Sequence, residues 1–170
     1  GELDYLLLDL PPGTGDIAMT LAQLLPQAKI TVVTTPQPAA QSVARRSVEM
    51  ANKVDLEVMG VIENMSGFTT PSGEKFSIFG EGGGQMLADE IGVPLLGTIP
   101  LSEELREHAD NGDPLVTAEP DSPAAKAILE TASRIIAQSP RDLPMIQETP
   151  AVPPAAPKLG ANARELPVLQ

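Results

Sequence analysis

The sequence predicts an α/β fold in which helices cover both faces of a parallel sheet. Short apolar runs alternate along the chain with longer segments of helical composition, and Pro or Gly follows most of the runs. The chain of 170 residues contains three Phe, one Tyr and no Trp, so its core must be aliphatic. Strands that alternate with helices form right-handed βαβ units, and such units build a parallel sheet.

The first apolar run covers residues 5–8 and ends at Asp9. A short, wholly apolar run is typical of a strand that is buried on both faces. A Pro-Pro-Gly sequence then stops the strand, and Thr14 or Asp16 is expected to cap a helix that extends to about Leu25. The predicted helix has one apolar face, which consists of Ile17, Leu21, Leu24 and Leu25.

Three more apolar runs predict strands, and the segments between and after them predict helices. Gly92 is expected to end one helix, Ser102 to cap the next, and Pro123 to stand in the first turn of the last. The expected strands cover residues 29–34, 58–62 and 95–99, and the expected helices cover 39–54, 85–91, 103–109 and 123–138.

Two segments lack periodicity. Residues 63–84 are polar and Gly-rich, which predicts a long loop. Seven of the 31 residues from 140 onward are Pro, which predicts a disordered or partly extended tail. The expected organisation is therefore one α/β domain over residues 1–139 and a Pro-rich tail over 140–170.

Charge and composition exclude several classes of function. The 23 acidic and 11 basic residues give a net charge of −12, which argues against a nucleic-acid or anionic-membrane surface. No apolar run approaches the roughly 20 residues of a membrane span, and no secretory signal is visible, so we expect a cytoplasmic protein. The absence of Cys excludes disulfides and cysteine-ligated metal sites built from this chain alone.

The end of the first predicted strand carries a candidate phosphate and metal site. An aspartate in this place, Asp9, matches the magnesium-linked carboxylate of P-loop NTPases. Gly13 can bring a backbone N–H close to a γ-phosphate, and Pro11 and Pro12 stiffen the loop between them. The alternative is an ordinary strand–turn–helix connection in which Asp9 and Asp16 are turn and cap residues.

The ends of two later strands carry a candidate base site. Asn64 presents a donor and an acceptor, as the edge of adenine requires, although Asn is also a common turn residue. The backbone of Pro100 and Leu101 can complete a base pocket. Ligands of parallel sheets bind beyond the carboxyl ends of the strands, which is where these residues are expected.

Other polar features are expected to be structural. The Gly-rich stretch 79–84 has the composition of a phosphate loop but neither its Lys-Ser/Thr nor a dinucleotide spacing, so we interpret it mainly as a hinge. His108 is expected on a solvated helix surface, and Arg45 and Arg46 are expected to pair with nearby acids. A G-x-x-x-x-G-K-[ST] loop is absent from the sequence.

Several blocks in order resemble the Mrp/ApbC family of P-loop ATPases, which belong to the MinD/ParA-like group and carry iron–sulfur clusters. The first block, residues 4–16, is similar to the family's switch II region. The later blocks are residues 34–37, 60–66, 78–84, 96–101 and 110–114, so the resemblance covers about residues 3 to 116.

The resemblance implies a role for each candidate residue. Asp9 would be the Walker B-type carboxylate near Mg²⁺, reached indirectly, and residues 11–15 would sense the γ-phosphate of ATP. Asn64 would contact adenine, and Pro100 and Leu101 would line the base pocket. The resemblance further implies a homodimer, a 4Fe–4S cluster as cargo and apo iron–sulfur proteins as clients.

The sequence departs from the family pattern in two ways. The Walker A loop lies upstream of such a switch II segment, so this chain resembles the C-terminal half to two-thirds of a member and is expected to be inactive alone. Many members carry Cys-x-x-Cys after Asn-Met-Ser, whereas Thr70 stands at the first cysteine position here. Because thiolates ligate the cluster, this departure argues against cluster binding in the usual way.

Three hypotheses follow from these observations. The first is an ATP-hydrolysing iron–sulfur cluster carrier. The second is a MinD/ParA-like regulatory ATPase switch without a cluster. The third is a non-catalytic α/β segment that has no nucleotide affinity.

Overall fold

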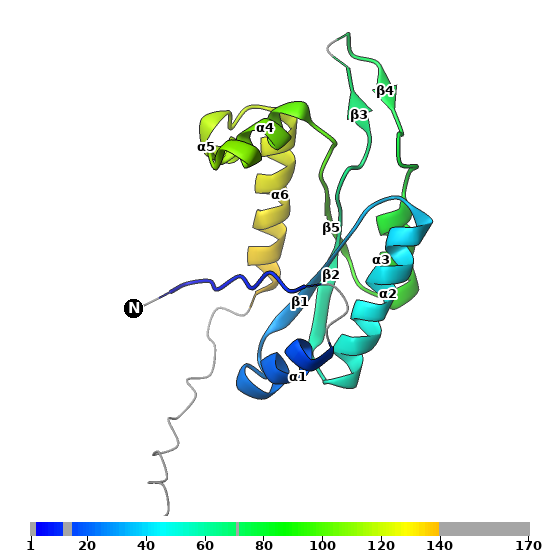
Figure 1. Ribbon diagram of the computed structural model, residues 1–170, viewed down its shortest axis with the longest axis vertical. Coiled ribbons are helices and arrows are strands. Elements are labelled where there is room, and N and C mark those ends of the chain that lie inside the picture. The colour runs from blue at the N-terminus through cyan, green and yellow to red at the C-terminus, as the bar shows by residue number, and fades with distance from the viewer. Residues whose placement is uncertain (1–2, 12–14, 71, 140–170) are drawn as a thin grey trace, which may run out of the picture.

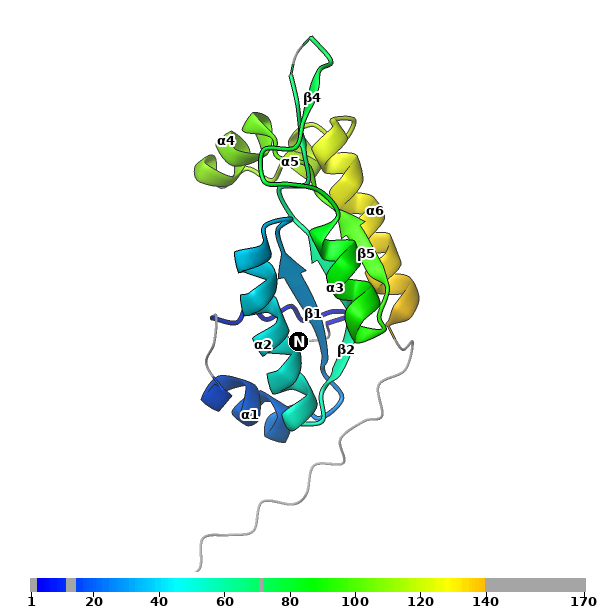
Figure 2. The same cartoon turned by 90° about the vertical axis from the view of Figure 1, so that its right-hand side faces the viewer.

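A parallel three-stranded sheet forms the centre of the molecule, as the computed structural model shows for residues 3–11, 15–70 and 72–139. The strands lie in the order β1 (Lys29–Thr34), β2 (Glu57–Glu63) and β5 (Leu95–Thr98). Helices α2 (Pro38–Lys53) and α3 (Gly83–Ile91) lie on one side of the sheet and α6 (Pro123–Gln138) on the other (Figures 1 and 2). The predicted α/β class is therefore confirmed.

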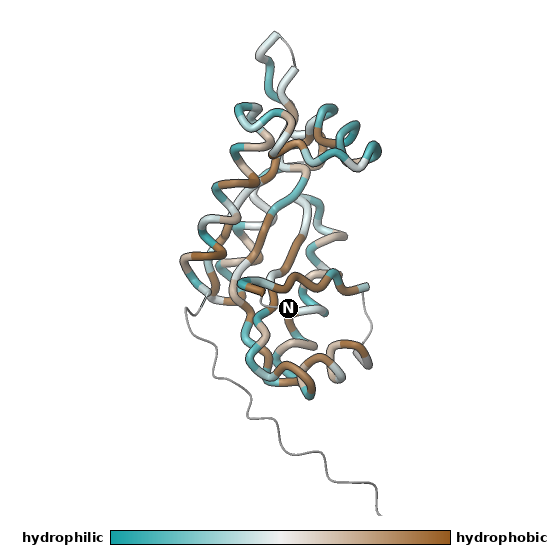
Figure 3. The backbone as a smooth tube through the Cα atoms, turned by 90° about the vertical axis from the view of Figure 1, so that its left-hand side faces the viewer, coloured by the Kyte–Doolittle hydropathy of each residue, from teal (hydrophilic) through white to brown (hydrophobic). Residues whose placement is uncertain are grey.

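Aliphatic side chains fill the space between the sheet and the α2–α3 layer. Val61 in the central strand and Leu87 in α3 are completely buried. In Figure 3 the brown, apolar stretches of the strands lie inside the body, whereas the surrounding helices alternate in colour. Each such buried aliphatic side chain contributes about 1.5–3 kcal/mol through the hydrophobic effect. The remaining buried members of this core are Val32, Ala44, Val48 and Ala88.

A second, smaller core joins the last three helices. Leu115 of the short helix α5 (Leu115–Ala118) packs with Ala124 and Ala125 at the start of α6. Leu105 of α4 (Glu103–Asn111) packs against this cluster. The helix α5 was not predicted, because four residues are too few to show a helical period.

Three predicted helix ends are confirmed, at Gly92, at Ser102 and at the start of α6. The cap predicted for the first helix is not, since Asp16 lies inside α1 and Thr14 lies outside the described residues. Gly92 follows α3 with a φ of 74°, the left-handed conformation that glycine adopts without strain. The Ser102 side chain accepts a hydrogen bond from Leu105 N, and the Ser122 side chain accepts one from Ala125 N. Each cap satisfies a backbone donor that the first helical turn would otherwise leave unpaired.

The predicted strand over residues 5–8 is wrong. This segment is extended but forms no strand, and Leu7 is 86% exposed. A strand needs a neighbour that supplies backbone partners and cover for both faces, and the described residues place none beside it. The helix α1 (Gly15–Leu24) forms as predicted, but its expected apolar face is only partly covered, since Leu24 is 68% exposed.

The predicted long loop 63–84 contains a hairpin. Strand β3 (Phe68–Thr69) pairs with β4 (Lys75–Phe76) in antiparallel register, and the hairpin extends well beyond the body of the molecule (Figures 1 and 2). Strands of two residues are too short to show alternation, which is why the sequence pattern missed them. The predicted tail, residues 140–170, lies outside the described residues. Among the described helices, none combines the length and apolarity of a membrane span.

Candidate functional site

The carboxyl ends of β2 and β5 bring the predicted base-site residues together. Asn64 directly follows β2 and Pro100 follows the end of β5, and these strands are neighbours in the sheet. Ile99 N donates to Glu63 O at 2.8 Å, and Ser66 N donates to Ile99 O at 2.9 Å. These two bonds continue the strand pairing past the sheet and join the two loops.

The same pairing reaches Leu101. Leu101 N donates to Gly67 O at 2.8 Å, and Leu101 forms an isolated parallel bridge with Phe68 at the base of the hairpin. The two loops that contain Asn64, Pro100 and Leu101 are therefore joined by backbone hydrogen bonds at the carboxyl ends of the strands, where the strand-end rule predicts ligand-binding residues.

The backbone beside Asn64 is strained. Met65 has a φ of 56°, a left-handed conformation that is uncommon for residues other than Gly, Asn and Asp. The Asn64 Oδ1 accepts a hydrogen bond from Met65 N at 2.9 Å, and Asn64 N donates to Thr34 O at 2.7 Å. Asn64 thus forms a local turn through its side-chain oxygen, as expected of a turn residue. Non-glycine strain of this kind is concentrated at functional sites.

A buried hydroxyl lies close by. Thr35 follows β1, and its Oγ1 is buried without a hydrogen-bond partner in the described part of the chain. Its neighbour Thr34 is paired through its carbonyl with Asn64 N. An unpaired buried hydroxyl costs about 1–3 kcal/mol, so an orphan at the ligand end of a sheet fits a site that receives a polar group.

Glu63, the last residue of β2, was not predicted as a site residue. Its side chain is buried, with 2% of its surface exposed. Its Oε1 accepts a hydrogen bond from Ser66 Oγ at 2.5 Å, and its Oε2 accepts one from Gly84 N at 2.5 Å. The only signal in the sequence was an acidic residue that directly follows an apolar run.

Glu63 also explains the Gly-rich stretch before α3. The first backbone donors of a helix attract anions, which is the basis of phosphate loops. Here the carboxylate of Glu63 already occupies the Gly84 N–H. This geometry favours the structural interpretation of residues 79–84 over a phosphate-binding role.

The predicted phosphate-side residues lie elsewhere. Asp9 and Pro11 are exposed in the extended N-terminal segment, which lies at the level of the strands, below the hairpin and α4 in Figures 1 and 2. Pro12 and Gly13 lie outside the described residues. The strand ends therefore join the loops that contain the base-side residues, whereas Asp9 and Pro11 lie in a different, exposed segment.

The hairpin carries a hydroxyl, that of Thr70, where the family resemblance would place the first cluster ligand, and the second ligand position is deleted. Thr70 Oγ1 and Ser72 Oγ share a hydrogen bond of 2.8 Å, and Thr70 Oγ1 accepts another from Glu74 N at 3.1 Å. The sequence contains no Cys. Among the described residues, no group of three or more His, Asp or Glu side chains is placed to hold a metal ion.

A family model described as "ParA: NUBPL iron-transfer P-loop NTPase" matches residues 1–136. The chain belongs to this family. The Mrp/ApbC-like resemblance is thereby confirmed at the level of the family, since the match includes every resembling block of the sequence.

Curated relatives of this NUBPL-type chain are named iron-sulfur cluster carrier protein. The protein of Mycobacterium leprae is 50% identical over 138 residues, which are 78% of this chain and 36% of the relative. The protein of Pseudomonas fragi is 50% identical over 132 residues, which are 77% of this chain and 46% of the relative. The chain thus spans less than half the length of these relatives.

Solved structures agree on the fold. A nucleotide-binding protein from Archaeoglobus fulgidus in complex with ADP is 39% identical, with a TM-score of 0.57 over 66% of this chain and 46% of that one. The cell division ATPase MinD of Pyrococcus furiosus, at 23% identity and a TM-score of 0.50, covers 64% of this chain and 43% of that one. The latter supports the fold alone.

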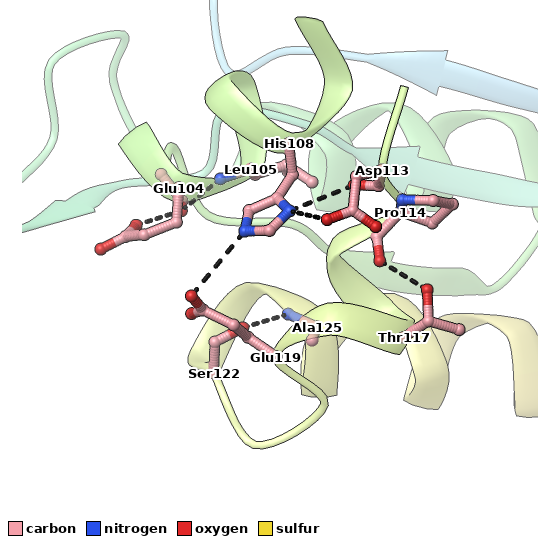
Figure 4. A network of polar contacts seen from close by, with 10 residues as sticks. Glu104, Leu105, His108, Asp113, Pro114, Thr117, Glu119, Ser122 and Ala125 are labelled. Carbon is pink, nitrogen blue, oxygen red and sulfur yellow. Dashed lines mark hydrogen bonds and ion pairs between the residues drawn. The ribbon is translucent and has the colours of Figure 1, made fainter. Parts of the chain in front are cut away.

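The helices α4 and α5 of this family member form a polar network (Figure 4). His108 Nδ1 lies 3.2 Å from Asp113 Oδ2, and His108 Nε2 lies 3.7 Å from Glu119 Oε1. His108, expected on a solvated helix surface, is only partly exposed: 22% of its side chain is accessible, and Asp113 in the turn after α4 contacts its ring. The Ser102 hydroxyl, which bonds to the Glu104 carboxylate at 2.6 Å, lowers the pKa of Glu104.

The ion pair expected at Arg45 is confirmed. Its guanidinium lies 2.7 Å from Glu90 Oε2 and links α2 to α3. This hydrogen bond lowers the pKa of Glu90 and raises the pKa of Arg45. Both side chains are substantially exposed, so the pair contributes little to stability.

Proposed function

We propose that this protein is an ATP-binding and ATP-hydrolysing carrier of iron–sulfur clusters. Two facts support the proposal: the chain is a NUBPL-type P-loop NTPase, and relatives at 50% identity are named iron-sulfur cluster carrier protein. The single structural observation that supports it is the backbone hydrogen bonding, at the carboxyl end of the sheet, between the two loops that contain Asn64, Pro100 and Leu101. A relative at 39% identity was solved with ADP bound, which fits a nucleotide at this end.

Different residues of this chain would contact the base and the phosphates of the nucleotide. Asn64 would read the adenine edge, and the loop at Pro100 and Leu101 would cover the base. Asp9 would hold Mg²⁺ through water, and the Gly13 N–H would meet the γ-phosphate. Mg²⁺ would supply charge neutralisation between the phosphates. The exposed Asp9 carboxylate has the hard oxygen that this ion prefers, and one such ligand is sufficient.

The iron–sulfur cluster would be cargo of this protein, and the hairpin does not fit it. Thr70 and Ser72 offer hydroxyls, whereas clusters are held by thiolates. We therefore assign no step of cluster binding to these residues. The wider proposal includes a homodimer, apo iron–sulfur proteins as clients and a cytoplasmic location.

Reconstitution tests the carrier role. The protein expressed from its complete reading frame would be incubated with iron and sulfide, desalted, and analysed for bound iron and for visible absorption. The carrier role predicts cluster absorption and bound iron, held by ligands other than the hairpin hydroxyls. Protein without absorption and without iron would contradict the carrier role.

One alternative, a regulatory ATPase switch of the MinD/ParA type without a cluster, requires no thiolates in the hairpin, whereas the names of the relatives support the carrier role. ATP hydrolysis in the absence of any bound iron would support this alternative. Absence of both ATP binding and iron from the complete protein would contradict both functions.

A further inference from the structure

We propose that Glu63 is a positioning residue that holds the Asn64–Ser66 turn in the conformation that receives the base. The inference rests on the proposed function, because it assumes that Asn64 contacts a nucleotide. It concerns a residue that does not itself touch the nucleotide and acts through the backbone that follows it.

The Glu63 carboxylate is buried and fully engaged. The side chain is among the largest fully buried groups of the molecule, yet it forms no ion pair with a basic group of the described residues. Both of its oxygens accept hydrogen bonds, one from Ser66 Oγ and the other from Gly84 N, each at 2.5 Å. Because a buried carboxylate costs free energy unless its oxygens are satisfied, this arrangement constrains both donors strongly.

Helix α3 fits closely against this side chain. A Cβ at Gly84 would lie 2.6 Å from the Glu63 Cβ, so only glycine permits the contact. A Cβ at Gly83 would lie 2.6 Å from Pro36 O, in the loop after β1. The start of α3 is therefore packed against two strand ends, and it provides a fixed anchor for Oε2.

Glu63 also spans the strained turn. Met65, with its φ of 56°, lies between Asn64 and Ser66. On one side Asn64 N is bound to Thr34 O, and on the other Ser66 is bound through its hydroxyl to Glu63 and through its N–H to Ile99 O. A left-handed Met persists only when its surroundings hold it. Two side chains supply part of that restraint: Asn64 Oδ1 accepts from Met65 N, and the Glu63 carboxylate holds Ser66. Loss of the carboxylate would allow the turn to relax and Asn64 to move.

The test compares Glu63→Ala, Glu63→Gln and Ser66→Ala in the protein expressed from its complete reading frame. Glu57→Ala, at the exposed opposite end of the same strand, is the matched control; it removes only the surface pair with Lys29. ATP and GTP affinities are measured by equilibrium titration. Hydrogen exchange of residues 64–67 is followed without nucleotide.

We expect Glu63→Ala to weaken ATP binding about tenfold. The ATP-to-GTP affinity ratio should come close to one, because a displaced Asn64 side chain would no longer distinguish adenine from guanine. Glu63→Gln should stay within about threefold of wild type, since its carbonyl can accept from Gly84 N and its amide can donate to Ser66 Oγ. Ser66→Ala should show an intermediate loss, and it serves as the informative variant where Glu63→Ala does not fold.

A purely structural role would lower the melting temperature of Glu63→Ala and Ser66→Ala but leave the ratio of ATP affinity to GTP affinity at its wild-type value. This result would overturn the inference. Failure of the proposed function looks different: wild-type protein would then bind no nucleotide. If wild-type protein binds no nucleotide, hydrogen exchange still tests whether Glu63 restrains the Asn64–Ser66 turn. Faster exchange at residues 64–67 in Ser66→Ala supports it, and unchanged exchange contradicts it.

Discussion

Two regions of this molecule end an apolar run with polar residues, yet they have opposite environments. At the end of β2, the chain from Glu63 to Ser66 is joined by hydrogen bonds to β1, β5 and α3. Around Asp9, the chain is extended and exposed, and Leu7 has 86% of its surface in contact with solvent. Apolar composition thus indicates that burial of a segment would be favourable, but the segment is buried only where neighbouring strands pack beside it.

This difference also divides the candidate site. The described residues build the side of the site that would receive a base. The side that would receive phosphates depends on Asp9, which lies in the exposed N-terminal segment, and on Gly13, which lies outside the described residues. Four substitutions probe this division, and we expect their effects to decrease in the order given below.

The greatest loss is expected in the core. Leu87→Ala removes a completely buried side chain, and Leu→Ala changes of this kind cost about 2–5 kcal/mol in the free energy of unfolding. Leu7→Ala, in the exposed segment, should change it by less than about 0.5 kcal/mol. Denaturant unfolding of the 170-residue chain measures both. Equal losses would show that residues 5–8 are buried after all.

The second effect concerns catalysis. In the protein expressed from its complete reading frame, Asp9→Asn should lower ATP turnover by about 100-fold, because removal of one electrostatic group at the reacting phosphate costs about that much. Circular dichroism should remain unchanged, since Asp9 is exposed. Wild-type turnover in the variant would contradict the role of this carboxylate.

The third effect concerns the orphan hydroxyl. Thr35→Val replaces the buried, unpaired Oγ1 with a methyl group of similar size. We expect the free energy of unfolding to rise by about 1 kcal/mol, because a desolvated donor is removed. A decrease measured by denaturant unfolding would mean that the hydroxyl has a partner in solution.

The weakest effect is expected at the surface pair between α2 and α3. Since Arg45 lowers the pKa of Glu90, the pair stabilises the fold above the ordinary pKa of a carboxyl group. That contribution is lost as the pH falls through the lowered pKa of Glu90. Glu90→Gln should therefore lower the melting temperature slightly at pH 7 but not at pH 3. Glu49→Gln, at an exposed position of α2, is the control and should show neither change.

Local patterns were sufficient for much of this fold. The predicted strand 29–34 coincides with β1, and the caps at Gly92 and Ser102 were found because their chemistry is local. The strand-end rule likewise placed Asn64 beside Pro100, because parallel strands bring their carboxyl ends to one edge.

The missed features depend on contacts between distant residues. Glu63 meets Gly84 across 21 positions, and nothing near Glu63 in the sequence indicates that partner. His108 is partly covered by Asp113 and Glu119, which follow its own helix, so the pattern of that helix alone could not indicate these contacts. The hairpin is defined by pairing over two residues on each strand, which is too short for any period.

We expect this chain to supply the base side of a nucleotide site whose phosphate-binding loop is not in its sequence. A calorimetric titration of the 170-residue chain with ATP and Mg²⁺ tests this expectation without any substitution. We predict very weak binding or none, because the chain has no G-x-x-x-x-G-K-[ST] loop to hold the phosphates. Micromolar affinity for the chain alone would show that the phosphates are held by other residues and would contradict this division of the site.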